Sequence, residues 1–199
     1  MAISNTSISP LLKEGDNITL TQSGQVTTIS AVTFGTAINL TSGQIQFPAG
    51  QVASADANTL DDYEENTWTP TLSATGSTFN YATNGQIGTY TKIGRMVCLH
   101  FRIQLATTGN TLIASNLSIT GIPSALTSGS GTNRTFYSSI YWANFTTSVI
   151  NVLVELPPSS TSMTVYRLTA AATSPTNLLA NALNATSGSV LGGQITYFV

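Results

Sequence analysis

Apolar and polar residues alternate in short runs along most of the chain, and this two-residue period is typical of β-strands with one buried face. In the C-terminal two thirds these runs are enriched in β-branched and aromatic residues, and Gly, Pro and Asn separate them. They predict strands at residues 67–73, 88–93, 96–105, 116–119, 135–144, 149–156, 162–168 and 194–199. Eight strands at this spacing predict an all-β fold, an antiparallel β-sandwich of jelly-roll type. Only residues 176–183 have a spacing of Leu and Ala that favours a short turn of helix.

The first fifty residues are polar, rich in Ser and Thr, and contain shorter alternating pieces. Residues 18–21 and 26–29 flank Gln22-Ser23-Gly24-Gln25, which predicts a β-hairpin with a Gly-containing turn. An isolated hairpin is only marginally stable in water. We therefore expect this region to be stabilised by sister chains or by a docking protein.

The composition limits the classes of partner. Charged residues make up 7% of the 199 residues, against roughly 25% in a typical domain, whereas Ser and Thr exceed a quarter. A surface with so little charge can be buried against copies of itself, which favours a stable oligomer. The six basic residues are scattered and the net charge is −2, so no nucleic-acid partner is expected. No apolar run approaches the roughly 18 residues of a membrane span, so membrane insertion is not expected.

Cys98 and His100 are the sole residues of their types, and both lie in the predicted strand 96–105. The apolar surroundings of Cys98 favour a small buried hydrophobic residue over a reactive thiol. His100 alternates with Cys98 and Arg102, which predicts a position on the polar face of the strand. The alternative is a metal site formed by three copies of His100 on a three-fold axis. One histidine supports no Ser-His-Asp arrangement and no phosphate-binding Gly loop is present, so no enzymatic activity, cofactor or metal is predicted.

Four of the eight acidic residues crowd together: Asp61, Asp62, Glu64 and Glu65. Their mutual repulsion favours an exposed or extended segment. Asp62 and Glu64 share one face of an extended chain, about 6.5–7 Å apart, which is compatible with a glycosidase pair. Nothing nearby predicts the apolar pocket such a pair needs, and residues 51–75 lack the Gly typical of a Ca²⁺ loop. We interpret the cluster as a solvated or subunit-contacting junction.

The acids belong to the longer motif FPAGQVASADANTLDDYEENTWTPTL (residues 47–72), which is followed by GQIGTYTKIGRMV (residues 85–97). LSITGIP (117–123), a Tyr-Trp strand and a terminal GQITYFV come next in order. Together these segments resemble tail-fibre and related receptor-binding proteins of tailed bacteriophages. The match departs at Asn66, where Gly often follows the acids.

This resemblance implies an organisation for the chain. Residues 1–50 would form an N-terminal attachment or shaft region, residues 51–66 an acidic junction, and residues 67–199 a C-terminal β-sandwich head. It also implies a homotrimer with a jelly-roll-like head. Residues 1–50 would bind a phage tail or baseplate protein.

The resemblance further implies adhesion to the host cell surface, with an envelope polysaccharide as the bound glycan. The protein would be made in the host cytoplasm and would work on the virion tail, since the N-terminus shows no signal peptide. One alternative is a purely structural fibre of the neck, baseplate or capsid. A second is a tail-associated polysaccharide depolymerase, which normally has a long repetitive β-helix, and no internal repeat is visible here.

The densest aromatic segment is FYSSIYWANF, residues 136–145. Aromatic residues on both faces predict a central strand buried on both sides or at a subunit contact, with Trp142 in the core. Binding residues concentrate on loops carried by a rigid scaffold. We therefore expect receptor contacts in the 128–134 loop, at the start of the aromatic strand and in the 144–148 turn. The candidate residues are Ser130, Asn133, Arg134, Tyr137 and Asn144.

Overall fold

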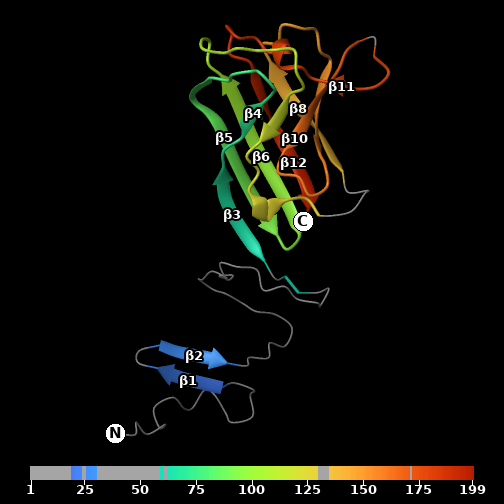
Figure 1. Cartoon of the computed structure of the whole chain (residues 1–199). Helices are drawn as coiled ribbons and strands as arrows, with labels where there is room; N and C mark the ends of the chain where they lie inside the picture. Colours follow the sequence, from blue (N-terminus) through green and yellow to red (C-terminus); the bar gives the residue numbers. More distant parts are fainter. Residues whose placement is uncertain (1–18, 24–25, 31–58, 61, 130–134, 171) are drawn as a thin grey trace. The chain divides into compact units, whose positions relative to one another are not determined.

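The computed structural model describes residues 19–23, 26–30, 59–60, 62–129, 135–170 and 172–199 (Figure 1). The chain divides into two compact units, Met1–Gln46 and Phe47–Val199. The described residues form β-strands and two short 3-10 turns, so the all-β prediction is confirmed.

The N-terminal unit contains the expected hairpin. Strand β1 (Thr19–Ser23) pairs antiparallel with β2 (Val26–Ser30), with Ser23 opposite Val26 beside the turn. The prediction from the Gly-containing turn is therefore confirmed.

The C-terminal unit is built from a single antiparallel sheet that curls into two layers. Its elements are β3 (Tyr63–Trp68), β4 (Thr71–Ser73), β5 (Tyr81–Ile93), β6 (Met96–Leu105), β7 (Ser118–Thr120), η2 (Ser124–Leu126), β8 (Phe136–Ala143), β9 (Asn151–Leu156), β10 (Met163–Leu168), β11 (Thr176–Asn177), η3 (Ala180–Ala182) and β12 (Val190–Phe198). The strand order is β3-β5-β6-β12-β8-β9-β10-β7-β4, with β11 paired to β10. The closer likeness to a jelly roll stays a prediction.

Strand β8 joins the two layers. Residues 141–143 of β8 pair with β12, whereas residues 136–140 pair with β9. One layer therefore consists of β3-β5-β6-β12 and the other of β8-β9-β10-β7-β4, with β8 passing between them.

A sharp corner joins the layers a second time. Only Thr69 and Pro70 separate β3 from β4, although these strands lie at opposite ends of the strand order. Gly121 makes the corner possible, because a Cβ on this residue would lie 2.2 Å from the Thr69 carbonyl oxygen. Its φ of 98° is also one that side-chain-bearing residues rarely adopt. The predicted strand 67–73 is thus divided at Pro70, which fixes φ and removes an amide donor.

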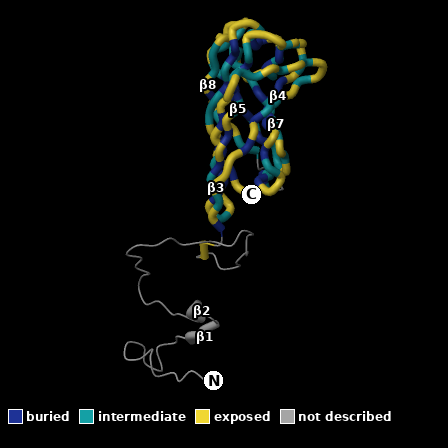
Figure 2. Tube along the Cα trace, turned by 90° about the vertical axis from the view of Figure 1, so that its left-hand side faces the viewer, coloured by how far each residue is buried: buried dark blue, intermediate teal, exposed yellow. Residues whose placement is uncertain are grey.

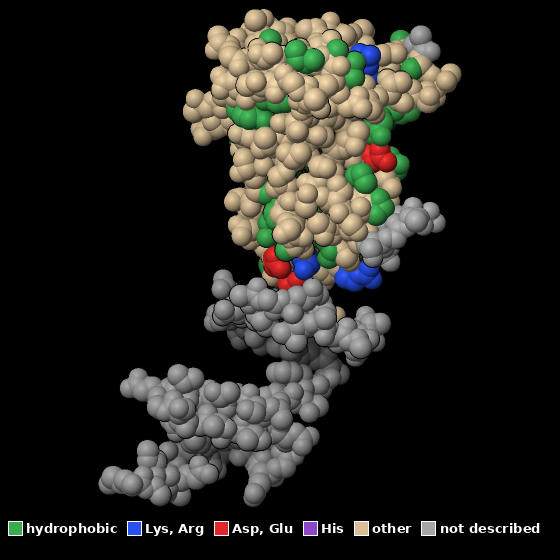
Figure 3. All heavy atoms as spheres, viewed as in Figure 1, with side chains coloured by type: hydrophobic (Ala, Val, Ile, Leu, Met, Phe, Trp, Pro, Cys, Tyr) green, Lys and Arg blue, Asp and Glu red, His purple; other side chains and the backbone are tan. Residues whose placement is uncertain are grey.

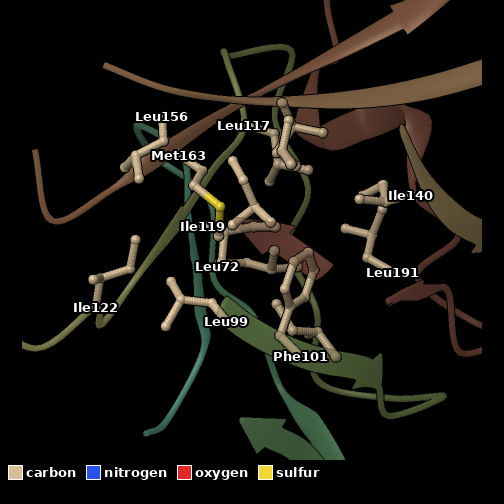
Figure 4. Packing of buried hydrophobic residues seen from close by; sticks show 14 of the residues in the cluster. Leu72, Leu99, Phe101, Leu117, Ile119, Ile122, Ile140, Leu156, Met163 and Leu191 are labelled. Carbon is tan, nitrogen blue, oxygen red and sulfur yellow. The ribbon is translucent and has the colours of Figure 1, made fainter. Parts of the chain in front are cut away.

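The core lies between the two layers. In β6, residues Val97, Leu99, Phe101, Ile103 and Leu105 are buried while the alternate residues are exposed or half-buried, as the two-residue period predicts. Figure 2 shows the same alternation along the strands of this unit. Side chains from both layers meet in Figure 4, among them Leu72, Leu99, Phe101, Ile119, Ile140, Leu156 and Met163.

The acidic junction differs from its prediction at Asp62. This residue is 1% exposed, and its carboxylate lies 2.5 Å from the buried ammonium of Lys92 in β5. Glu64 lies 3.8 Å from the same ammonium and accepts a hydrogen bond from Tyr90. The cluster is therefore not simply a solvated segment, because Lys92 compensates the charge that would otherwise keep Asp62 in water. The sheet accordingly begins at Tyr63, inside the predicted 51–66 junction.

The expected short turn of helix within residues 176–183 is confirmed in part, as the 3-10 turn η3, whereas Thr176–Asn177 form strand β11. Leu178, between them, is held by backbone pairing with Leu117 and Val165. A further expectation was wrong. Cys98 is half-buried on the outer face of β6 and is not a core residue. Its side chain lies 3.5 Å from His100 Nε2, and His100 is exposed on that polar face, as predicted.

Candidate functional site

The aromatic strand β8 has one buried and one open face. Phe136, Ile140 and Trp142 turn inward, with Trp142 half-buried against the core. Tyr137 and Tyr141 turn outward and are 65% and 64% exposed, the highest values among the large apolar side chains of the described residues. The expectation of a strand buried on both sides is therefore wrong for this chain by itself. The alternation that places Trp142 inside necessarily places both tyrosines outside.

A carboxylate lies beside the first of these tyrosines. Tyr137 pairs with Glu155 of β9, and its hydroxyl donates to Glu155 Oε1 over 3.2 Å. Tyr166 of β10 lies on the same face, one pair along from Glu155, and its phenol also interacts with this carboxylate. The carboxylate is thus held between two phenols on three neighbouring strands.

The carboxylate contributes to a raised pKa of both phenols. The hydrogen bond to Glu155 is the largest cause that raises the pKa of Tyr166 to about 12, and desolvation and the negative charge of Glu155 add to it. Desolvation and then Glu155 raise the pKa of Tyr137 as well. Both hydroxyls therefore remain donors at neutral pH.

The remaining groups on this face are uncharged. Leu153 pairs with both Ser139 and Tyr166, and Asn151 donates to the Ser139 hydroxyl over 3.3 Å. We call the surface formed by Tyr137, Ser139, Tyr141, Asn151, Leu153, Glu155 and Tyr166 the tyrosine face. It extends about 13 Å along β8 between the two exposed tyrosines. Ring faces and a methyl-bearing side chain offer apolar contact there, while hydroxyls, an amide and a carboxylate offer hydrogen bonds.

Few charged groups compete with these contacts. In the view of Figure 3 most of the described surface is backbone or uncharged polar side chain, and acidic groups gather in only two places. One of them lies on the flank of the unit beside hydrophobic side chains. Among the described acids, Glu155 is the one that does not belong to the junction.

The structure separates the residues that the sequence singled out. Ser130, Asn133 and Arg134 lie outside the described residues. Tyr137 lies near the start of the aromatic strand and belongs to the tyrosine face. Asn144 lies beyond the other end of β8, about 23 Å along the strand from Tyr137.

Asn144 forms hydrogen bonds with the neighbouring loop at residues 187–189. It has a φ of 59°, a conformation that Asn tolerates better than most residues. Its side-chain amide donates to the main-chain carbonyl oxygens of Ser187 and Gly188. Its main-chain carbonyl accepts a hydrogen bond from the Ser189 hydroxyl. These bonds favour a structural role at the turn.

Sequence reasoning missed Glu155 and Tyr166. The alternation in residues 151–156 places Glu155 opposite the buried Val152, Val154 and Leu156, so its exposure was predictable. Its proximity to two tyrosines was not predictable, because it depends on which strands pair and in which register.

Within the described part of the chain, no group of three or more His, Cys, Asp or Glu side chains is placed to hold a metal ion. The described residues also include no helix long and apolar enough to cross a membrane.

Comparisons with known proteins give one structural likeness. No protein-family model matches the chain, and no curated protein sequence matches it. The crystal structure of the Dettilon tailspike protein (gp208) matches with a TM-score of 0.52 and 20% sequence identity. The match covers 67% of this chain and 23% of the tailspike chain. At this identity the likeness shows a shared fold, and the chain corresponds to less than a quarter of that protein.

Proposed function

We propose that this chain is a subunit of a bacteriophage tail fibre or tail receptor-binding protein, which attaches the virion to a host surface polysaccharide. The tyrosine face is the observation that carries the proposal. The fold shared with a tailspike protein and the junction motif at residues 47–72 support it.

The chemistry of the tyrosine face suits a sugar. Exposed Tyr rings can stack against the C–H face of a pyranose while hydroxyl and amide groups fix its orientation. The Glu155 oxygens accept hydrogen bonds from sugar hydroxyls, and a charged acceptor makes these bonds about twice as strong as neutral ones. Because this charge is negative, the face favours neutral or amino sugars over sugars that carry carboxylate or phosphate groups.

The face is also held in place before a ligand arrives. Its residues lie on three hydrogen-bonded strands, and Glu155 fixes the hydroxyl ends of Tyr137 and Tyr166. Less side-chain entropy is therefore lost on binding than with free loops. The surface is shallow, so one copy would bind weakly, and several copies per virion would raise avidity by about 10²–10⁴.

The proposed assembly is a homotrimer, attached through residues 1–50 to a tail or baseplate protein. The low charge of the chain supports burial of surface between copies. In this proposal the mechanism is adhesion without turnover, and the protein works on the virion after synthesis in the host cytoplasm.

The proposal is tested by binding of the labelled full-length chain to intact susceptible cells, with soluble envelope polysaccharide as competitor. We expect Tyr137→Ala to weaken binding about tenfold or more, because one stacking ring and one fixed hydroxyl are lost. Ile113→Ala is the matched control, since Ile113 is also exposed but lies in a loop away from the tyrosine face.

The other outcomes identify the alternatives. A chain that folds but binds no susceptible host would favour a purely structural fibre. Release of reducing sugar from the polysaccharide would favour a depolymerase. Equal binding by Tyr137→Ala and Ile113→Ala would remove the tyrosine face from the mechanism.

A further inference from the structure

The outer face of the β3-β5-β6-β12 layer carries a continuous apolar row. Pairing places Tyr63 opposite Ile93, Ile93 opposite Met96, and Met96 opposite Phe198. These four side chains are 41%, 40%, 38% and 48% exposed, so each strand of the layer presents one open apolar residue at the same level. Figure 1 shows the start of β3 and the C-terminus at the same end of this layer.

The next two rows on this face are polar but almost uncharged. Register places Glu65, Thr91, Cys98 and Thr196 in one row and Thr67, Thr89, His100 and Gln194 in the following row. The Thr196 hydroxyl lies 3.5 Å from the Cys98 sulfur, which shows that the row members are in contact. Glu65 is the charged residue of these two rows. Arg102, in the row after them, is the other charged residue on the face and has the opposite sign.

Such a face is unusual for a surface that faces only water. Exposed apolar residues are normally scattered, whereas here four of them cross a whole layer in register. Exposed Thr residues on a flat sheet pack well against another sheet, because their methyl groups are apolar and their hydroxyls can pair across the contact.

We infer that this face, the subunit face, packs against other copies of the same chain. The inference rests on the homotrimer of the proposed function, not on glycan binding, and it assigns the surface through which the copies meet.

The charge pattern favours a second copy over other occupants. Glu65 and Arg102 are opposite in sign, so the face has no net formal charge and copies meet with little net repulsion. The one basic residue on the face offers no patch for a lipid or nucleic-acid surface. The outer face of the opposite layer would instead bring the unbalanced charge of Glu155 into the contact.

The place where the chain enters the sheet also favours contact between copies through this face. Tyr63 is the first residue of β3, so the apolar row lies at the end of the subunit face where the chain enters the sheet after residue 62. Copies held parallel by a shared attachment through residues 1–50 would therefore present the same row to one another.

The test uses the full-length chain and a pair of neutral double substitutions. Ile93→Ser with Met96→Ser removes the two central side chains of the row. Ile113→Ser with Ile150→Ser is the control, because these residues are 46% and 53% exposed and lie outside the subunit face. Circular dichroism and thermal melting establish that each variant keeps its β-structure.

The first readout is mass by light scattering. We expect the native chain and the control to have a multiple of the 20.8 kDa chain mass, and the row variant to have a smaller mass. A native chain with the mass of a single subunit would overturn the inference.

The second readout is the thiol of Cys98, since residues 1–50 alone could hold copies together. Cys98 is the single cysteine and lies on the subunit face beside the apolar row, so its reaction with an uncharged maleimide reports burial of that face. We expect the native chain and the control to react about tenfold more slowly than the row variant, with each rate scaled to that of the denatured chain. Equal scaled rates in all three proteins would overturn the inference, whatever their masses.

The two proposals fail separately. An assembled chain with a protected Cys98 that binds no host would leave the subunit face intact and remove the adhesion proposal. A chain that binds host polysaccharide with a freely reactive Cys98 would do the reverse.

Discussion

The ion pair between Asp62 and Lys92 is the residue-scale feature that fixes where the sheet begins. Both side chains are buried, at 1% and 6% exposure, and the Asp62 carbonyl also accepts a hydrogen bond from the Gly94 amide. A buried pair of this kind contributes little relative to apolar residues, but either partner becomes costly when the other is removed.

We therefore expect Lys92→Met to lower the free energy of unfolding by about 3–5 kcal/mol, because Asp62 is left buried without a counter-charge. Denaturant unfolding measures the change. The double variant Asp62→Asn with Lys92→Met should lose much less than the sum of the single variants. Additive losses would show that the two charges do not interact.

Tyr166 gives a second residue-scale prediction. Glu155, together with desolvation, raises its pKa to about 12 from the ordinary 10.0, so the folded chain holds the phenolic proton more tightly than the unfolded chain. The contribution to stability is complete below pH 10 and is lost between about 10 and about 12, so the free energy of unfolding falls as pH rises through this window.

Glu155→Gln removes the negative charge, and the Tyr166 pKa should then fall toward 10.0 in a titration that follows the ultraviolet absorbance of phenolate. The Tyr166→Phe variant identifies which step of the titration belongs to Tyr166, because that step is absent from it. Burial alone raises the pKa of Tyr197, so its transition should not move in the Glu155→Gln variant.

At the scale of elements, the corner between β3 and β4 holds the two layers together. Gly121 lies against Thr69 at this corner, and the neighbouring Gly88 lies against Trp68, where a Cβ would be 2.6 Å from the Trp68 carbonyl oxygen. Trp68 in turn donates to the His100 carbonyl and packs edge-on against Phe101. The corner is therefore tight: the backbone of Thr69 and Pro70 fills the space beside Gly121, and the backbone and indole ring of Trp68 fill the space beside Gly88.

We expect Gly121→Ala to lower the free energy of unfolding by about 2–4 kcal/mol, since it combines a positive φ with a clash against backbone. Gly76→Ala is the matched control: its φ is 74°, but a Cβ there would meet only Ile113, at 3.7 Å. Its loss should be about 1 kcal/mol. Similar losses in the two variants would show that the close approach to Thr69 contributes nothing.

The elements also show how far local patterns reach. Residues 96–105 form β6 with the predicted bounds, and the inward and outward faces of β6 and β9 follow the two-residue period. The period does not distinguish one strand from two consecutive strands, and residues 67–73 were divided by Pro70. The period also does not distinguish an outer face that is covered from one that is open. For this reason the outer face of the aromatic strand, which carries Tyr141, was expected to be buried but is exposed.

At the scale of the whole molecule, the proposed subunit face and the tyrosine face are centred on different layers. The first belongs to β3, β5, β6 and β12, while the second belongs to β8, β9 and β10. The two faces approach each other at Tyr141, which pairs with Gly192 of β12 in the row of Arg102. The inner sides of the layers meet in one core (Figure 4). Contact between copies through the apolar row would leave Tyr137 and Glu155 open to a polysaccharide.

The low charge of the chain is compatible with contact between copies over a whole layer. Few charges are spread over the visible surface (Figure 3), and the outer face of the β3-β5-β6-β12 layer has only Glu65 and Arg102. The sequence alone predicted an oligomer from this scarcity and offered the acidic junction and the aromatic strand as subunit contacts, but it did not indicate this face. That step required the pairing of the strands.

By itself, the amino-acid sequence determined the strand period, the buried side of strands such as β6 and β9, and the pairing of β1 with β2, because each depends on residues close together in the chain. The tertiary structure alone decided that Glu155 lies between Tyr137 and Tyr166, and that Tyr63, Ile93, Met96 and Phe198 form one row. Alternation assigns a side chain to a face, but register assigns its neighbours. Register is set by long-range pairing that optimises the whole core, and no local pattern contains it.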